Sequence, residues 1–271
     1  MGASLSGPAD WRDVNRANWD ARVPIHLASR LYDVDAFVAG REPLFDHEPA
    51  EVGDVRGRTL LHLQCHLGLD TLSWARRGAT VTGLDFSRPA LDVAASVAAR
   101  IGARSARFVL ADVYEAAAVL AGETFDVVYT NVGSLQYLPD LPRWARVVAT
   151  LVAPGGCCYV SDTHPLVHFV DDDGRTLCGD YFDRGAIRLD EGTYTDPAAP
   201  LASSASVEWM HSTADLVSAL GAAGLRVEFL HEHDWMWYPI LPVLERDGDG
   251  RWRFPEGRPR IPLQFSLRAV A

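Results

Sequence analysis

The sequence predicts an α/β fold, with a parallel sheet covered by helices on both faces. From Arg58 onward, apolar segments of strand length alternate with amphipathic segments of helix length, which is the pattern of such a sheet. The composition agrees, because 48% hydrophobic and 23% charged residues over 271 positions are typical of a packed globular protein. We therefore expect one domain that spans 1–271.

The first strand, helix and strand follow one another closely. "TLLHLQ" (59–64) predicts a strand, "LDTLSWARRG" (69–78) a helix that ends at a glycine, and "TVTGLD" (80–85) the second strand. Ser87 then predicts the N-cap of another helix, with Pro89 in its first turn. Apolar residues recur at helical spacing along that segment, so one stripe of it is expected to face the sheet.

Three further strands complete this part of the chain. "ARFVLAD" (106–112) and "FDVVYTN" (125–131) predict the third and fourth strands, and "CCYVSD" (157–162) predicts the fifth. Between the last two, apolar residues at helical spacing predict a helix over 141–151, which Pro154 and two glycines are expected to end.

The remaining segments divide the domain further. After His164 the alternation breaks for about 40 residues, which is typical of a lid or binding loop. Ser212 and Asp215 form a capping-box signature, and "LRVEFLHEH" and "PLQFSLRAV" predict two last strands. The expected division is listed by range: an N-terminal helical cap (1–50), a cofactor-binding half (58–163), a lid insertion (164–211) and a C-terminal helix with strands (212–271).

Charge and composition limit the partners. A formal net charge of -11 argues against nucleic acid, whose binding depends on Lys and Arg neutralising phosphates, so a small molecule is the expected partner. No apolar run approaches the roughly 20 residues of a membrane span, and the first residues do not resemble an export signal. The four cysteines include no CxxC pair. We therefore expect a cytoplasmic protein with reduced cysteines and no membrane partner.

The turn after the first strand is a candidate ligand loop. The first backbone N–H groups of a helix lack internal partners, so a tight strand-to-helix turn attracts electron-rich groups. Glycines at three positions normally admit a pyrophosphate, yet here Gln64 and His66 occupy two of them. We expect a smaller head group, held by backbone atoms of Gln64, Cys65 and Gly68. A buried strand with an incidental turn explains this motif alone about as well.

Acidic residues follow the next two strands. Asp85 lies 17 residues beyond Gly68, where a doubly wound fold keeps an acid for ribose hydroxyls, and Phe86 comes next. Asp112 ends the third strand beside Val113, a pair that suits an adenine amino group and its ring. Either aspartate alone is more typical of a helix or turn cap. Their order at successive strand ends favours one cofactor site.

These motifs together resemble the class I S-adenosylmethionine-dependent methyltransferase family. The matching segments are "LLHLQCHLG", "VTGLDFS", "LADVY" and "FDVVYTNVGSLQYLPDLPRWARVVATLVAPGG". The resemblance implies a Rossmann-like sheet of seven strands with the last one antiparallel, S-adenosylmethionine across the carboxyl ends of the strands, and methyl transfer. It also implies that Asn131 lies beside the methionine end of the cofactor. The chain departs from the family at His62, Gln64 and His66, where an acid and two glycines are usual.

Several side chains are candidates for acceptor chemistry. His164, after the fifth strand, is our first candidate for a base, although a histidine before proline is also typical of a cap. Tyr137 is the second, with packing under the lid as its alternative. Trp19 and His26 are expected on an N-terminal helix that closes over the cofactor.

The aromatic content of the C-terminal third suggests the kind of acceptor. The tryptophans and the tyrosine there fit a flat aromatic molecule; they are Trp209, Trp235, Trp237, Tyr238 and Trp252. The resemblance then extends to small-molecule methyltransferases of bacterial secondary metabolism, with the indole of a tryptophan-containing cyclic dipeptide as one possible acceptor.

Two other functions compete with an aromatic methyltransferase. An NAD-dependent oxidoreductase would share the fold and Asp85, but it would carry the glycine fingerprint. A non-catalytic module that binds S-adenosylmethionine would keep the cofactor residues without a base. A metal site at His231, His233 and Asp234 is not expected, since no second cluster completes it.

Overall fold

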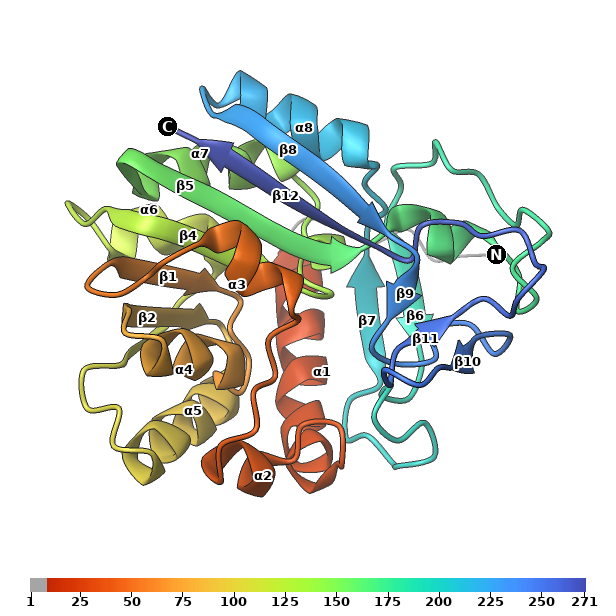
Figure 1. The fold of residues 1–271 in the computed structure, drawn as a ribbon, viewed down its shortest axis with the longest axis horizontal. Coiled ribbons are helices and arrows are strands. Elements are labelled where there is room, and N and C mark those ends of the chain that lie inside the picture. The colour runs from red at the N-terminus through yellow and green to blue at the C-terminus, as the bar shows by residue number, and fades with distance from the viewer. Residues whose placement is uncertain (1–8) are drawn as a thin grey trace.

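The centre of the molecule is a seven-stranded sheet with the order β3-β2-β1-β4-β5-β12-β8 (Figure 1). This computed structural model describes residues 9–271. The strands of the sheet are β1 (Thr59–Leu63), β2 (Thr80–Asp85), β3 (Arg107–Leu110), β4 (Phe125–Asn131), β5 (Val152–Thr163), β8 (Arg226–His233) and β12 (Gln264–Val270). β1 to β5 pair in parallel, whereas β12 pairs antiparallel with both β5 and β8. The predicted seven strands with the last one antiparallel are confirmed.

Helices cover both faces of this sheet because neighbouring strand residues point to opposite sides. Leu60 of β1 belongs to a core with Trp74 on one face, and the next residue, Leu61, belongs to a core with Trp144 on the other. The helices of the first face are α3 (His47–Val52), α4 (Leu69–Arg76) and α5 (Arg88–Arg100). Those of the second face are α6 (Ala116–Val119), α7 (Leu141–Leu151) and α8 (Thr213–Ala222). This two-faced covering is the α/β fold that the sequence predicts.

Local sequence signals predicted the starts of two helices correctly. The Ser87 hydroxyl accepts the amide of Ala90, and Ser212 forms the predicted capping box with Asp215. Some strand boundaries were wrong by two residues or more: β3 ends at Leu110, two residues before Asp112, and β5 begins at Val152 rather than at residue 157. The turn residues Pro154, Gly155 and Gly156 lie within β5, where its pairing with β4 shifts register. The strand therefore accommodates these residues at an irregularity instead of starting after them.

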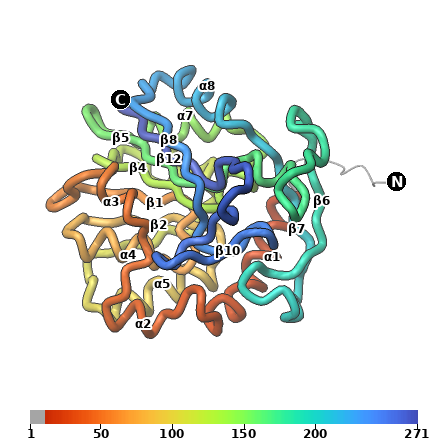
Figure 2. Tube along the Cα trace, turned by 45° about the vertical axis from the view of Figure 1, so that its right-hand side comes forward, coloured from red at the N-terminus to blue at the C-terminus, as the bar shows by residue number. Residues whose placement is uncertain are grey.

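The N-terminal segment lies beside the lid. α1 (Ala9–Ala28) precedes the short α2 (Val34–Val38), and Figures 1 and 2 show α1 next to the hairpin of β6 (Ile187–Asp190) and β7 (Ala205–Glu208). The buried Asn15 amide joins the two, because it donates to the carbonyl of Val207 at 2.8 Å and accepts that residue's N–H at 2.7 Å. α1 thus satisfies backbone groups of β7, the strand of the hairpin that faces it.

A small sheet near the C-terminus was not predicted. β9 (Trp235–Met236), β11 (Trp252–Arg253) and β10 (Glu245–Arg246) form an antiparallel sheet with its own apolar core, which includes Met236 and Phe254. This sheet lies with the lid at the carboxyl edge of the main sheet (Figure 1). It brings the C-terminal tryptophans to the edge where ligands bind in open α/β sheets.

Candidate functional site

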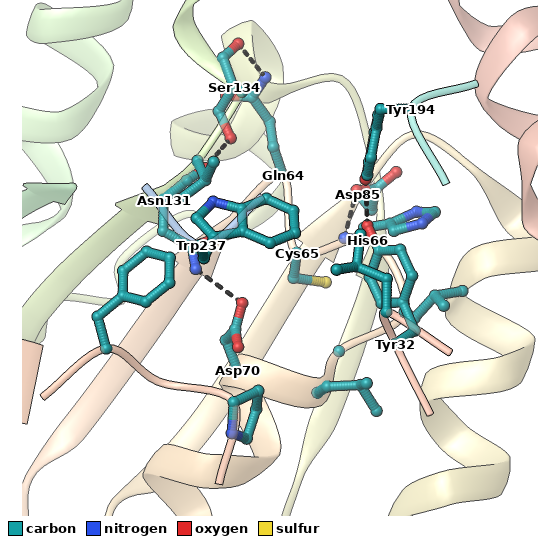
Figure 3. Close-up of a pocket in the computed structure, with 18 of the residues that line it drawn as sticks. Tyr32, Gln64, Cys65, His66, Asp70, Asp85, Asn131, Ser134, Tyr194 and Trp237 are labelled. Atoms are coloured by element: carbon teal, nitrogen blue, oxygen red, sulfur yellow. Dashed lines mark hydrogen bonds between the residues drawn. The ribbon is translucent and has the colours of Figure 1, made fainter. Parts of the chain in front are cut away.

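A cavity of about 480 Å³ lies at the carboxyl edge of the central strands. Its floor is the turn after β1, together with the ends of β2 and β4 (Figure 3). Side chains from distant segments form its walls: Trp19, Tyr32, Phe45, Glu48, Tyr194 and Trp237. Its size falls within the roughly 300–1,000 Å³ of small-molecule sites.

The turn after β1 has the backbone of a glycine-rich loop without most of the glycines. Gln64 and His66 adopt φ angles of 58° and 47°, and Gly68 adopts 71°. Left-handed geometry costs an L-residue roughly 1–2 kcal/mol. The turn is held by hydrogen bonds from the Cys65 amide to the Leu84 carbonyl (3.0 Å) and from the His66 amide to the Asp85 carboxylate (2.8 Å). The unusual residues therefore change the side chains at the cavity but not the course of the chain.

Gly68 serves helix packing as well as this turn. A Cβ atom there would lie 2.7 Å from Cβ of Ala94 and 3.0 Å from the Phe108 ring. The glycine therefore permits α5 to approach the turn closely, in addition to adopting a positive φ. The same residue lines the cavity, so ligand binding and packing depend on one position.

Asp85 is buried at the end of β2. One carboxylate oxygen accepts the Ser87 amide at 2.8 Å, and the other accepts the His66 amide at 2.8 Å (Figure 3). Burial raises the pKa of Asp85 to about 6, although both backbone hydrogen bonds favour the ionised form. Asp85 and Phe86 both line the cavity, and each carboxylate oxygen keeps acceptor capacity for a further donor.

A second cavity, of about 560 Å³, adjoins the first and shares Gln64, Phe86 and Tyr137 with it. Asp112 and Val113 line this one only. The Asp112 carboxylate caps the 3-10 helix η1 (Val113–Glu115), and its other oxygen accepts Nε of Arg12 at 3.0 Å. The predicted residues at the three strand ends are thus brought together along one groove, with Arg12 of α1 bound at its far end.

The end of β4 joins a buried polar network under the turn. The side-chain oxygen of Asn131 lies 3.0 Å from Nε2 of His62. The side-chain nitrogen of Asn131 donates to the Asp70 carboxylate at 2.7 Å (Figure 3). Nδ1 of His62 lies 2.8 Å from the hydroxyl of Thr71. Burial lowers the pKa of His62 to about 3 and raises that of Asp70 to about 6. A neutral imidazole therefore occupies the position where the family usually has an acid.

Two residues of the N-terminal helix α1 lie at the site, Trp19 in the cavity lining and His26 behind it. Trp19 lines the cavity, with its ring 5.4 Å from that of Tyr137. His26 lies behind the cavity wall, where Nδ1 is 2.8 Å from Nε2 of His66 and Nε2 is 2.6 Å from the hydroxyl of Thr193. His26 thus connects α1, the turn and the lid. Burial lowers the pKa of His26 to about 3, so this connection is made by neutral side chains at neutral pH.

The two catalytic candidates lie in different places. Tyr137 is buried and lines both cavities, and burial raises the pKa of its phenol above the usual range. His164 lies outside the cavity lining, where its ring caps the 3-10 helix η3 (Pro165–Phe169) by accepting the Leu166 amide at 3.2 Å. Its other ring nitrogen is 3.0 Å from the Glu232 carboxylate. The structure thus places His164 in the capping position that was the alternative interpretation.

Several residues of the cavity were not predicted, because they have no local sequence signal; among them are Glu48, Asp70, Tyr194 and Arg246. Among the aromatic residues of the C-terminal third, Trp237 lines the cavity, whereas Trp209 packs against Trp11 in the main core.

No metal site is present among residues 9–271, where no group of three His, Cys, Asp or Glu side chains could hold an ion. His231 instead contacts Glu51, and His233 contacts the hydroxyl of Ser266. Asp234 forms an ion pair with Arg260. The same described part of the chain has no helix with the length and hydropathy needed to cross a bilayer.

Known proteins with matching sequences are methyltransferases. Residues 61–158 match a family model described as a methyltransferase domain. The ubiquinone biosynthesis O-methyltransferase of Escherichia fergusonii is 35% identical over 142 residues, which cover 50% of this chain and 57% of that protein. The chain therefore matches little more than half the length of this curated relative.

Solved structures share the fold over nearly the whole chain. The CcbJ methyltransferase from Streptomyces caelestis has a TM-score of 0.61 at 17% identity, over 95% of this chain and 99% of that one. An S-adenosylmethionine dependent methyltransferase from Mesorhizobium loti has a TM-score of 0.58 at 22% identity, over 86% and 100%. These likenesses show that the overall fold is shared with other proteins.

Proposed function

We propose that the chain is a class I S-adenosylmethionine-dependent methyltransferase and that it transfers a methyl group to a small aromatic or heteroaromatic acceptor, since residues 61–158 match a methyltransferase domain. The observation that carries the proposal is the groove along three strand ends, which opens into a cavity walled by aromatic rings. A groove of this kind at the carboxyl edge is where an open α/β sheet binds a nucleoside.

The residues present fit S-adenosylmethionine. The side-chain oxygen of Gln64 is buried in the cavity wall without a hydrogen-bond partner among the described residues, so it is ready to accept from a ligand. We assign the adenine to Asp112 and Val113, the ribose to Asp85 and Phe86, and the methionine portion to a set at the turn and the end of β4. That set is Gln64, Cys65, Gly68, Asp70 and Asn131.

The cavity also suits the charge of the cofactor. When bound, S-adenosylmethionine supplies a methyl group on a positively charged sulfur. The ring of Trp19 and the phenol of Tyr137 present aromatic faces that tolerate a cation, and the buried carboxyl of Asp70 lies in the same cavity. Tyr32 and Tyr194 are hydrogen-bonded to each other over it (Figure 3). These residues orient the ligands and exclude water from the transfer.

The acceptor wall favours a flat ring with a hydrogen-bond acceptor. Phe45 and Trp237 lie with their ring centroids 6.4 Å apart, and Trp237 lies 6.2 Å from Tyr194. The indole N–H of Trp237 is buried without a partner among the described residues. An amide carbonyl of a tryptophan-containing cyclic dipeptide would satisfy this N–H while its indole packs on the rings, so we propose such a dipeptide as the acceptor.

Tyr137 is the residue we propose for contact with the acceptor, because it lies at the junction of the two cavities. We assign no catalytic step to His164, which is bound as a cap outside the lining. Three buried free cysteines and one exposed one agree with a reducing compartment, so we propose a cytoplasmic enzyme of secondary metabolism.

Calorimetry and a transfer assay test this function in two steps. We expect heat on titration with S-adenosylhomocysteine, unchanged in the exposed-residue control Asp92→Asn, and radiolabelled product from tryptophan-containing cyclic dipeptides. Heat without transfer to any aromatic acceptor would indicate a non-catalytic binding module. An absence of heat with the cofactor product, together with binding of NADH, would favour an oxidoreductase and contradict the proposal.

A further inference from the structure

The mouth of the cavity is basic. Five residues of the lining are exposed and therefore mark where the cavity opens to solvent. Three of them are arginines from separate segments: Arg30 from the loop between α1 and α2, Arg41 from the loop after α2, and Arg246 from β10. The other two are Glu42 and Tyr194. Positive charge thus gathers at this opening, although the chain has a formal net charge of -11.

The protein does not neutralise these charges. None of the ion pairs among residues 9–271 includes Arg30, Arg41 or Arg246. Glu42, the acid among the exposed lining residues, pairs instead with Arg77 at 3.2 Å. Because a guanidinium group does not lose its proton in proteins, the mouth keeps its positive charge at neutral pH.

Two of the guanidinium groups are held in place by neutral oxygens. Arg41 donates to the backbone carbonyls of Leu31, at 3.3 Å from Nη1, and of Tyr32. Nε of Arg246 donates to the carbonyl of Gly250 at 3.0 Å. These hydrogen bonds order the two side chains and leave their charge available. An anion at the mouth would therefore meet guanidinium groups that have already lost part of their freedom, which lowers the entropic cost of binding.

The charged acids of the cavity belong to its strand edge. Asp85 ends β2, and Asp70 lies in the first turn of α4 (Figure 3). The remaining acid of the lining, Glu48, is uncharged at neutral pH, since burial raises its pKa to about 8. An acidic edge suits the positively charged sulfur of the cofactor, whereas a basic mouth suits a negative group. The two charged parts of the cavity therefore suit two different ligands.

We propose that the methyl acceptor carries a carboxylate, which Arg30, Arg41 and Arg246 bind at the mouth of the cavity. This rests on the proposed function and names its acceptor as an aromatic acid. A guanidinium group can bind a carboxylate through two parallel hydrogen bonds, which fix orientation as well as affinity. With its ring against Phe45 and Trp237, the acceptor would direct its carboxylate to the mouth. In a tryptophan-containing cyclic dipeptide, the second residue would then be aspartate or glutamate.

Calorimetry with a matched acid and amide tests the inference without turnover. In protein saturated with S-adenosylhomocysteine, we expect indole-3-acetate to bind about tenfold more tightly than indole-3-acetamide at low salt. The ratio of the two dissociation constants should approach one at high salt, because the guanidinium groups are exposed. Binding of the acid that is no tighter than binding of the amide would overturn the proposal.

Substitution of the arginines shows whether they cause the preference. The double variant Arg30→Gln and Arg246→Gln should bind the acid and the amide equally, with its affinity for S-adenosylhomocysteine within twofold of wild type. The matched control is the double variant Arg104→Gln and Arg146→Gln, which changes the net charge equally at exposed arginines outside the lining. An unchanged preference in the first variant, or an equal loss of preference in the control, would contradict the proposal.

A transfer assay separates this inference from the proposed function. The cyclic dipeptide of tryptophan and glutamate should have a kcat/KM about tenfold above that of tryptophan and glutamine, through KM rather than kcat. Equal values of kcat/KM would overturn the inference and leave the proposed function standing. If the chain binds S-adenosylhomocysteine but methylates no aromatic acceptor, the proposed function fails instead, and the calorimetric comparison still decides whether the mouth binds a carboxylate.

Discussion

The two sides of the cavity are built in different ways. The strand-edge wall consists of the turn Gln64–Gly68 with Asp85 and Asn131, all of which follow neighbouring parallel strands. The acceptor wall consists of Phe45, Glu48, Tyr194 and Trp237, which come from segments far apart in the chain. Backbone pairing fixes the first wall, whereas side-chain packing fixes the second. Substitutions in the acceptor wall are therefore expected to leave the sheet unaltered, and under the proposed function this would separate cofactor binding from acceptor choice.

The largest expected difference between the walls is in their response to pH. The pKa of Glu48 is raised from 4.5 to about 8, so its contribution to stability is complete below pH 4.5 and is lost as pH rises through about 8. Since one pKa unit corresponds to about 1.4 kcal/mol, the wild-type unfolding free energy should fall by up to about 5 kcal/mol over this window relative to Glu48→Gln.

Asp85, on the strand-edge wall, provides the matched measurement for this pH series. Its pKa is raised to about 6, so the corresponding loss in comparison with Asp85→Asn should be complete near pH 6. Urea unfolding at pH 5, 6, 7 and 8 separates the two windows. Identical pH profiles for Glu48→Gln and the wild-type chain would show that Glu48 titrates normally.

The strand-edge wall should tolerate no added volume at its glycine. Gly68→Ala combines a positive φ with a Cβ contact of 2.7 Å, so we expect a loss of about 3 kcal/mol from strain and overpacking. Gly102 has a similar φ of 73° with nothing near its Cβ position, which makes Gly102→Ala the control, with a loss of about 1 kcal/mol. If urea unfolding gave equal losses of unfolding free energy for the two variants, α5 would have shifted to make room for the added methyl group.

Cofactor affinity should depend on one wall only. Asp85→Asn places a donor opposite a backbone N–H, and we expect S-adenosylhomocysteine to bind about 30-fold more weakly, which corresponds to about 2 kcal/mol. Trp237→Phe should leave this affinity within twofold and instead raise the KM of the acceptor. Isothermal titration calorimetry measures the affinity for S-adenosylhomocysteine. A clearly lower affinity in Trp237→Phe would contradict the separation of the two walls.

The smallest expected effect is relief of strain in the turn. Gln64 has a φ of 58°, so Gln64→Gly should be more stable than Gln64→Ala by about 1 kcal/mol. The exposed helical position Ala99 supplies the opposite case, since Ala99→Gly should lose about 1 kcal/mol. Thermal unfolding of the variants measures both changes in stability. If Gln64→Gly were less stable than Gln64→Ala, the turn would not be strained.

The sequence indicated the residues of the strand-edge wall, whereas on the acceptor wall it indicated only Trp237, for a physical reason. Strand ends such as Asp85 and Asn131 follow local apolar runs, and parallel strands bring those ends to one edge, so their proximity follows from the fold class. Glu48 and Trp237 line the same cavity although they lie 189 positions apart, and no local periodicity of the sequence indicates this. The two-residue strands β9 to β11 are also too short to show alternation, so the small sheet was missed, and Trp237 directly follows its strand β9.

The same reasoning explains the turn itself. The sequence shows Gln64 and His66 where glycines are usual, which argues for a different loop, yet the backbone takes the glycine-like path. The reason lies in contacts that are distant in sequence, because the carboxylate of Asp85 holds the His66 amide in place. Tertiary bonds therefore override local preference at this turn, as is common at sites where strain serves function.

The roof over the cavity is closed by paired neutral groups rather than ions. Tyr32 bonds to Tyr194 and His26 to Thr193, joining segments more than 160 positions apart. A ligand that passed between these two segments would have to break both pairs. Since no formal charge holds the pairs together, we expect the rate of such passage to stay nearly constant from low to high ionic strength.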